Sequence, residues 1–279
     1  MARSSKKPAR RRKRSPSLSN RRVDAFLREV GIRPRMIADD FWASLRSTYG
    51  DQADTFIGYV DRRRTTDKAE AIHQEDVAAL YKLKNASLEF SIALTSQYVG
   101  RLYSSYLAVV ASLGLDRQAK AVLDLGCDNG ILTAFYATLF PEAKVLGVDR
   151  CHEAIACANM LKDRLELPNL TFVVADAFQE PAASVLPLQS WDVVVMTLCG
   201  YEELDRHPER TGRIAARFFD YLKPSGVGVV VEYPDSSLMP ALEVYGGRCR
   251  KWWLAYEAFG GDESYVDVAE IEVRRDPVG

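Results

Sequence analysis

Histidine and cysteine are scarce in this chain of 279 residues, which limits the metal chemistry it can support. The three histidines stand far apart, at His73, His152 and His207, and the five cysteines include no Cys-x-x-Cys pair. Metal sites and disulfide scaffolds both depend on ligands or cysteines that cluster at short spacing. We therefore expect neither a metal centre nor a disulfide framework, and free thiols suit a reducing compartment such as the cytoplasm.

Long apolar runs are also missing. No stretch approaches the ~18 to 20 consecutive apolar residues that a membrane-spanning helix needs, so we expect no membrane span. The charged first residues are not followed by an apolar segment, and we expect no secretory signal. Hydrophobic residues make up 47% of the chain and charged residues 27%, which is typical of a globular protein with a full core.

Acidic residues are absent from the N-terminus. Residues 1–22 hold ten Lys and Arg, which leaves 27 basic and 38 acidic residues, a net charge of −11, for the remainder. Residues 1–20 are expected to form a disordered basic tail, because such a composition cannot bury apolar surface. The tail could tether the chain to nucleic acid or another anionic partner, carry a nuclear address, or only keep the protein in solution. These alternatives stay open.

Apolar spacing divides the rest of the chain near residue 118. Residues 21–118 show helical periodicity: Val23, Phe26, Leu27 and Val30 share one helix face, and further helices are expected over 40–49 and 96–113. This part is predicted to be a helical extension or lid. The part from 119 to 279 is predicted to be a separate domain.

Short β-rich runs alternate with helices in that second part, which is typical of a parallel sheet covered on both faces. The predicted strands are 121–125, 144–148, 170–174, 192–196 and 226–232, and the predicted helices are 131–140, 153–165 and 211–222. Residues 248–259 and 265–274 flank a Gly-Gly turn and predict an antiparallel hairpin. The expected fold is an open α/β sheet that follows a helical extension.

A glycine loop, residues 126–130, joins the first predicted strand to the first helix of this sheet. Gly126 would allow a sharp turn and a close approach to a ligand, and Gly130 would let the helix begin against the strand. We expect Asp128 or Asn129 to cap that helix. A dinucleotide fingerprint is excluded because positions 128 and 131 are not glycine, and no GxxxxGK[ST] phosphate loop occurs.

Acids follow the next two strands. Asp149 ends the second strand, where a carboxylate can accept hydrogen bonds from both hydroxyls of a ribose. Asp176 follows the third, with Phe178 beside it, and together they offer an acceptor for an exocyclic amine and a face for a purine. The chain thus has an acid suited to a ribose but no loop suited to a pyrophosphate. This combination indicates a ligand that is a nucleoside without a diphosphate at its far end. Structural roles, as loop anchor, helix cap or turn residue, remain the alternatives for Asp124, Asp149 and Asp176.

At these residues the sequence resembles the class I S-adenosylmethionine-dependent methyltransferases, over roughly residues 119–279. Asp124, Gly126 and Gly130 match the family's D/E-x-G-x-G-x-G loop, whereas Asp128 replaces the middle glycine. The resemblance implies a Rossmann-like sheet with a terminal antiparallel hairpin, S-adenosyl-L-methionine as cofactor, and methyl transfer as activity. It also implies cofactor contacts from Asp124, Gly126, Cys127, Asn129, Gly130, Asp149, Arg150, Asp176, Ala177, Phe178 and Thr197.

The methyl acceptor is less specified. In the segment after the fourth strand, which faces the methyl group in this family, Tyr201 and Glu202 are candidates for acceptor orientation or a base. The family's [DNS]-P-P-[YFW] motif is missing, since the chain has no Pro-Pro, which argues against nucleobase amines and glutamine as acceptors. A small-molecule acceptor is favoured. An RNA or protein acceptor reached through the tail, and a methyltransferase-like binding protein without catalysis, are the alternatives.

Overall fold

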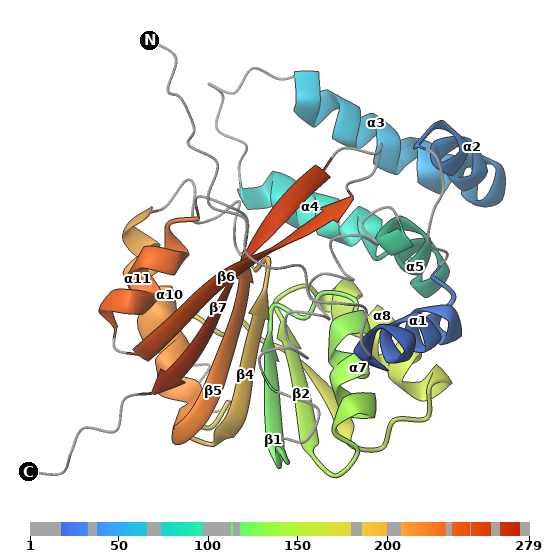
Figure 1. The fold of residues 1–279 in the computed structure, drawn as a ribbon. Coiled ribbons are helices and arrows are strands. Elements are labelled where there is room, and N and C mark those ends of the chain that lie inside the picture. The colour runs from blue at the N-terminus through green and yellow to red at the C-terminus, as the bar shows by residue number, and fades with distance from the viewer. Residues whose placement is uncertain are drawn as a thin grey trace, which may run out of the picture.

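A seven-stranded sheet forms the centre of the protein, in the order β3-β2-β1-β4-β5-β7-β6 (Figure 1). The structure is a computed structural model that describes residues 18–32, 38–65, 74–96, 113, 118–179, 186–199, 208–232, 236–245, 247–257 and 263–273. Its strands are β1 (Ala121–Leu125), β2 (Lys144–Asp149), β3 (Leu170–Val174), β4 (Trp191–Thr197), β5 (Leu222–Glu232), β6 (Gly247–Glu257) and β7 (Glu263–Val273). The first five are parallel, and β7 runs antiparallel to both β5 and β6. The strand order reverses between β1 and β4, which is where open α/β sheets bind ligands.

Helices cover both faces of this sheet. The helices of the second half are α7 (Ile131–Leu139), α8 (His152–Arg164), α10 (Pro208–Tyr221) and α11 (Leu238–Val244), and those of the first half are α1 (Leu18–Val30), α2 (Ala38–Tyr49), α3 (Asp51–Thr65), α4 (Gln74–Lys84) and α5 (Leu88–Ser96). Buried residues of α1, α7 and α8 pack on one face, and those of α10 and α11 on the other. The parallel strands β1 to β4 are mostly apolar because helices cover both faces of the sheet there.

The predicted fold class is confirmed: a Rossmann-like sheet with a terminal antiparallel hairpin and helices before it. One boundary differs, since β5 begins at Leu222 rather than at residue 226. Leu222 pairs with Trp191, and the register then shifts so that Val227 pairs with Val193. The irregular stretch contains Pro224 and so has the composition of a turn. Helix α11 was not predicted, because it is short and contains a proline.

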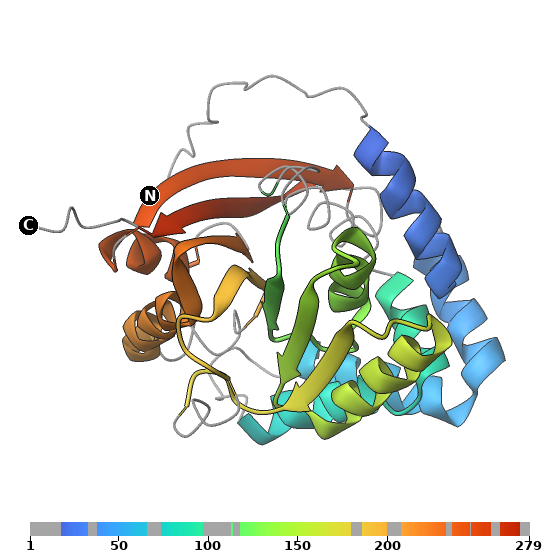
Figure 2. The same cartoon turned by 90° about the horizontal axis from the view of Figure 1, so that it is seen from below.

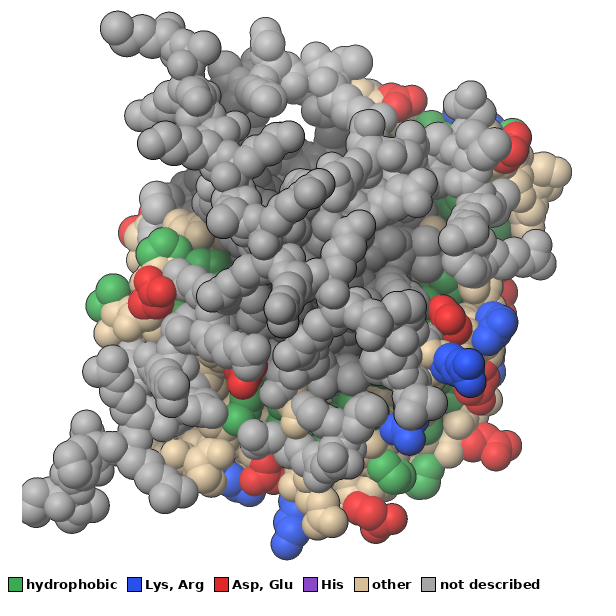
Figure 3. Space-filling view, in the orientation of Figure 1, with side chains coloured by type: hydrophobic (Ala, Val, Ile, Leu, Met, Phe, Trp, Pro, Cys, Tyr) green, Lys and Arg blue, Asp and Glu red, His purple; other side chains and the backbone are tan. Residues whose placement is uncertain are grey.

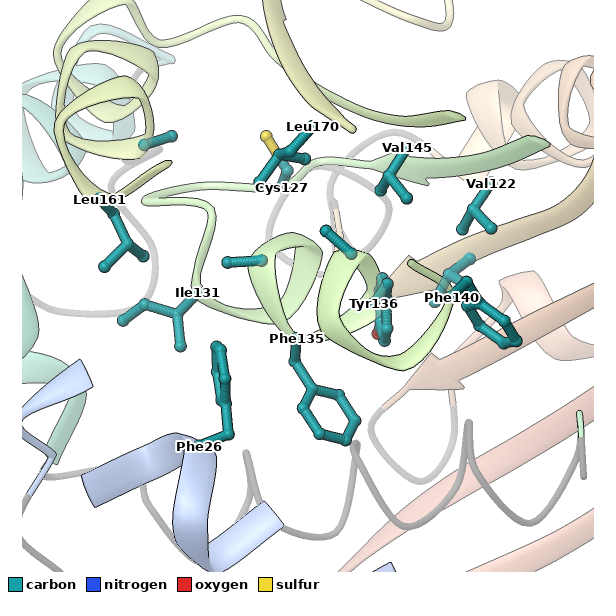
Figure 4. Packing of buried hydrophobic residues seen from close by; sticks show 14 of the residues in the cluster. Phe26, Val122, Cys127, Ile131, Phe135, Tyr136, Phe140, Val145, Leu161 and Leu170 are labelled. Atoms are coloured by element: carbon teal, nitrogen blue, oxygen red, sulfur yellow. The ribbon is translucent and has the colours of Figure 1, made fainter. Parts of the chain in front are cut away.

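The N-terminal helix α1 belongs to the same hydrophobic cluster as the sheet. Its residues Val23, Phe26, Leu27 and Val30 are buried, as the spacing predicted. The ring centroids of Phe26 and Phe135 on α7 lie 5.3 Å apart, and Figure 4 shows the two side chains side by side. Helix α1 begins at Leu18, within the segment predicted to be tail, and residues 1–17 lie outside the described part of the chain.

Helices α2, α3 and α5 share a separate small cluster, which contains Phe41, Leu45, Phe56 and Phe90. The N-terminal helices run along one flank of the sheet (Figure 2). The helix predicted over 40–49 is present as α2, whereas the one predicted over 96–113 lies almost wholly outside the described residues. No helix in the described ranges is long and apolar enough to cross a bilayer. On the flank that carries α1 and α5, Figure 3 shows acidic and basic side chains interspersed.

Candidate functional site

The glycine loop lies where the chain leaves β1, next to the end of β2. The backbone N–H groups of Gly126 and Cys127 both donate to the carbonyl oxygen of Val148, at 2.8 and 3.0 Å. Gly130 N–H donates to the carbonyl oxygen of Cys127 at 2.9 Å and closes the loop just before α7. The loop is therefore tied to β2 at the point where the strand order reverses.

Both predicted glycines of the loop have left-handed backbone conformations, with φ +72° at Gly126 and +75° at Gly130. A Cβ atom on Gly126 would lie 2.2 Å from the Sγ atom of Cys199, and one on Gly130 would lie 2.5 Å from Cζ of Phe172. Each position requires glycine for its backbone conformation and for the space around it. The backbone of the loop consequently packs directly against the side chains of Cys199 and Phe172.

Asp128, which replaces the family's middle glycine, also adopts a left-handed conformation with φ +48°. Its carboxylate pairs with the ammonium group of Lys84 and accepts a hydrogen bond from Nδ2 of Asn85 at 3.0 Å. The neighbouring Asn129 donates from Nδ2 to the hydroxyls of Ser91 and Thr95, at 2.8 and 3.0 Å. The loop is thus fastened from outside by α4, by α5 and by the turn between them.

The prediction that Asp128 or Asn129 caps α7 is wrong. The N-cap residue is Gly130, and no side chain caps the helix. Oδ1 of Asn129 lies 3.5 Å from the nitrogen of Ile131, at the limit of a hydrogen bond. Both side chains turn instead to α4 and α5, whose side chains the local sequence of the loop cannot indicate.

Asp149 lies beside the loop at the end of β2. Its Oδ2 accepts from the backbone N–H of Asp128 and its Oδ1 from that of Cys151, each at 2.9 Å. Burial raises the pKa of Asp149 and the charge of Asp128 raises it further, while those two hydrogen bonds and Arg150 oppose the shift. The predicted ribose acid therefore also serves as the turn residue that begins α8, so the two alternatives are compatible.

Asp124 is buried beneath the loop, with 2% of its surface exposed. Its Oδ2 accepts a hydrogen bond from the Thr133 hydroxyl at 2.6 Å, which links β1 to α7. Burial raises the pKa of Asp124 to about 7; the Thr133 hydrogen bond lowers it, and Asp149 raises it. These contacts suit the role of loop anchor that the sequence left open.

Residues 175–178 continue the same edge beyond β3. The backbone N–H of Ala175 donates to the carbonyl oxygen of Asp149 at 3.0 Å, which joins the two segments. Asp176 Oδ1 accepts from the backbone N–H of Phe178 at 3.0 Å, and the Tyr221 hydroxyl donates to the carbonyl oxygen of Ala177. Asp176 is thus a turn residue in a segment that is hydrogen-bonded to Asp149.

Thr197, at the end of β4, holds a buried hydroxyl. Its Oγ1 atom has no hydrogen-bond partner among the described residues, although a buried hydroxyl without a partner is unfavourable. Leu198, which follows, has φ +52°, and Cys199 comes next against Gly126. A ligand at this edge of the sheet could supply the missing partner.

Cys199 has acidic groups near it. Burial raises the pKa of the Cys199 thiol, and the charges of Asp149, Glu232 and Asp124 raise it further, while Arg150 lowers it. Cys127 is likewise buried and its pKa is raised by burial, so it is a packing residue rather than a nucleophile. The described ranges contain no cluster of ligands for a metal ion.

Several neighbours of the site were not predicted from sequence. Glu232 is fully buried at the end of β5. The sequence could have indicated it, because an acid that ends an apolar strand is a candidate for the carboxyl edge of the sheet. Lys84, Asn85 and Ser91 have no sequence signal, because they reach the loop only through the packing of α4 and α5. The candidate catalytic residues Tyr201 and Glu202 lie outside the described residues.

The family comparison covers this same half of the chain. Residues 116–252 match the family model described as a methyltransferase domain, and the strand order has its switch point at the glycine loop. This part of the chain is a class I methyltransferase domain. The sequence resemblance is thereby confirmed.

Two curated relatives match the methyltransferase domain. The trans-aconitate 2-methyltransferase of Deinococcus radiodurans is 34% identical over 119 residues, and that of Methylobacterium radiotolerans is 31% identical over 121 residues. Each match covers 43% of this chain and 40% of the relative. Among solved structures, TrmN from Thermus thermophilus is similar with a TM-score of 0.50 and 21% identity, over 61% of this chain and 49% of that protein. This last similarity concerns the fold alone.

Proposed function

We propose that this chain transfers a methyl group from S-adenosyl-L-methionine to a small molecule. The observation that carries the proposal is the glycine loop at the switch point of a methyltransferase domain, with Asp149 beside it. The loop lies at the switch point, where open α/β sheets bind ligands, and an acid at the end of β2 suits a nucleoside.

The residues at the site fit such a cofactor. A carboxylate has about four lone-pair positions, and two of those on Asp149 are used by backbone N–H groups. Two positions remain for the two hydroxyls of a ribose. Phe178 would face the adenine, Asp176 would accept from its exocyclic amine, and the unsatisfied Thr197 hydroxyl would gain a partner near the methionine part.

The bound cofactor would supply a methyl group on a sulfonium, which an acceptor lone pair takes as the carbon–sulfur bond breaks and sulfur keeps the electron pair. The protein would supply position and a suitable field. Asp149 and Glu232 lie near Cys199, and the negative charge that these acids carry would favour a cationic group there. Cys127 and Cys199 would line the site without reacting.

The proposed acceptor rests on the names of the relatives rather than on the geometry of the site. Both curated relatives are named for trans-aconitate, so a small carboxylic acid is the first acceptor to assay. An anionic acceptor would need basic groups to offset the acids near Cys199. Tyr201 and Glu202 stay the candidates for orienting the acceptor.

Calorimetry with S-adenosylmethionine and S-adenosylhomocysteine tests the cofactor. Asp149→Ala should weaken binding by ~1.5 to 3 kcal/mol, the range for losing hydrogen bonds to a charged group. Asp163→Ala on the exposed side of α8 is the matched control and should bind as the wild type does. Affinity of Asp149→Ala equal to that control would reject the ribose assignment.

Transfer of a labelled methyl group in cell extract tests the acceptor. We expect label in the small-molecule fraction. Label in RNA or protein would instead favour an enzyme directed by its basic tail, and cofactor binding without any labelled product would favour a binding protein. We place the reaction in the cytoplasm because the four described cysteines are all free, and a nuclear site would follow if the tail serves as an address.

A further inference from the structure

We infer that Lys84 and Asn85 are positioning residues for the cofactor, which act on Asp149 through the backbone of Asp128. The inference rests on the proposed function, since it assigns these residues to the same cofactor site. It makes the end of α4 and the turn into α5 part of that site rather than a separate cover (Figure 1).

The first link joins α4 to the loop. Lys84 and Asn85 both engage the Asp128 carboxylate, and the Lys84 ammonium also lies 5.6 Å from the ring centre of Tyr81. The side chains of Lys84 and Asp128 are only 20% and 25% exposed. Partial burial makes this ion pair stronger than one at the surface, because water screens it less.

A second link runs through buried polar side chains. The Ser91 hydroxyl donates to Oδ1 of Asn85 at 2.6 Å and accepts from Nδ2 of Asn129 at 2.8 Å. Asn85, Ser91, Thr95 and Asn129 are each 5% exposed or less. Removal of one member would leave another buried and unsatisfied, so the network holds residues 128 and 129 in one arrangement.

The last link reaches the ribose acid. With φ +48°, Asp128 directs its backbone N–H to Oδ2 of Asp149, at 2.9 Å. That bond orients the carboxylate, and the Lys84 charge offsets that of Asp128, which otherwise disfavours the ionised form of Asp149. A glycine at position 128 would adopt this φ without strain, but it could not transmit a contact from α4.

Two other contacts between the same elements provide controls. Lys82 pairs with Glu153 and Glu89 with Arg164, so each ties α4 or α5 to α8 without contact to the loop. Lys82→Met and Lys84→Met remove the same charge from the same helix. They differ in whether the lost partner belongs to the loop and in exposure, since the side chain of Lys82 is 71% exposed and that of Lys84 20%.

The test measures S-adenosylhomocysteine binding by these two variants. We expect roughly tenfold weaker binding for Lys84→Met, as for the loss of one charged hydrogen bond, and less than about a twofold change for Lys82→Met. The 2′,3′-dideoxyribose analogue cannot bond to Asp149, so the penalty of Lys84→Met should shrink to about twofold with it. Lys84→Arg should restore most of the lost affinity. Thermal unfolding of both Met variants checks that the fold is intact.

Asp128→Gly provides a second, independent measurement. It should weaken S-adenosylhomocysteine binding, though less than Lys84→Met because it also removes the charge that disfavours ionised Asp149, and the double variant should be no weaker than Lys84→Met alone. Wild-type affinity of Asp128→Gly, or equal penalties for Lys82→Met and Lys84→Met, or the same penalty with the dideoxy analogue, would each overturn the inference. A wild-type protein that does not bind S-adenosylhomocysteine would instead overturn the proposed function.

Discussion

At the scale of single residues, the site depends on glycine positions where no larger side chain than a hydrogen atom fits. Gly126 combines a left-handed backbone with a Cβ position that Cys199 already fills. Gly31, just after α1, has φ +94° and no atom within 4 Å of its Cβ position. The two glycines therefore separate the effect of backbone conformation from the effect of close packing.

Gly126→Ala and Gly31→Ala should consequently differ. We expect Gly31→Ala to lower the free energy of unfolding by ~1 to 2 kcal/mol, the strain of a left-handed alanine. Gly126→Ala should lose a further ~1 to 3 kcal/mol through overpacking against Cys199, and should also lose cofactor binding. Urea denaturation and calorimetry measure both effects. Equal losses in the two variants would contradict the packing at Gly126.

Asp124 predicts a pH dependence of stability. Its pKa is raised from 3.8 to about 7 by burial, so between those values the folded protein binds a proton that the unfolded chain lacks. The contribution of Asp124 to the free energy of unfolding is therefore fully present below about pH 3.8 and is lost as the pH rises through about 7. The total loss is on the order of 4 kcal/mol. Asp124→Asn cannot titrate, and its free energy of unfolding should fall less than that of the wild type between about pH 5 and 8.

The raised pKa of Asp149 acts in the same direction in both proteins, so the difference between them isolates Asp124. Urea denaturation at the two pH values provides the measurement. An identical decrease in wild type and variant would show that Asp124 is ionised throughout.

The sequence predicted those site residues whose roles follow from their own type and position. Gly126 follows an apolar strand and Asp149 ends one, so their location at the carboxyl edge of the sheet could be derived. Lys84 could not be found in this way, since its partner Asp128 is 44 positions further along the chain. Which partner a polar side chain meets depends on packing that no local pattern encodes.

At the scale of elements, α1 is expected to stabilise the methyltransferase domain directly. Phe26 is 4% exposed and contacts Phe135 on α7, within the cluster that includes the sheet. Phe56 is 5% exposed but belongs to the cluster of α2, α3 and α5. Two phenylalanines of similar burial thus belong to different parts of the core.

Phe26→Ala should destabilise the protein by ~3 to 5 kcal/mol and speed hydrogen exchange in β1 and β2. Phe56→Ala should speed exchange in α2, α3 and α5 and leave β1 and β2 unchanged. Hydrogen exchange followed by mass spectrometry distinguishes the two patterns. Faster exchange in β1 and β2 in both variants would mean that the two clusters unfold together.

The order of the last strands shows what element patterns leave open. Both strands of the hairpin were predicted, but not that the later one, β7, lies between β5 and β6. Alternating residues indicate that a strand exists and which side is buried, whereas its neighbour depends on the path of the chain. The parallel part of the sheet was easier to predict, because a helix between two parallel strands allows few ways of connecting them.

At the scale of the whole molecule, charge divides the chain unequally, with ten basic residues in the first 22 and a net −11 in the rest. We expect deletion of residues 1–17, which ends where α1 begins, to leave S-adenosylhomocysteine affinity unchanged. Full-length protein should bind a labelled duplex in low salt, with a slope of roughly −0.9 per phosphate contact, and the shortened form should not. Fluorescence anisotropy at several salt concentrations measures this. Equal, negligible binding by both forms would contradict a tether.

The position of β7 also has a consequence for synthesis on the ribosome. Strand β5 can complete its parallel pairing with β4 while its other edge awaits residues 263–273, which are made after the other six strands of the sheet. Until they arrive, β5 presents an apolar edge of unpaired backbone groups, which is a template for association between chains. A chain that stops before residue 263 should therefore aggregate rather than form a smaller enzyme, because nothing then covers this edge of β5.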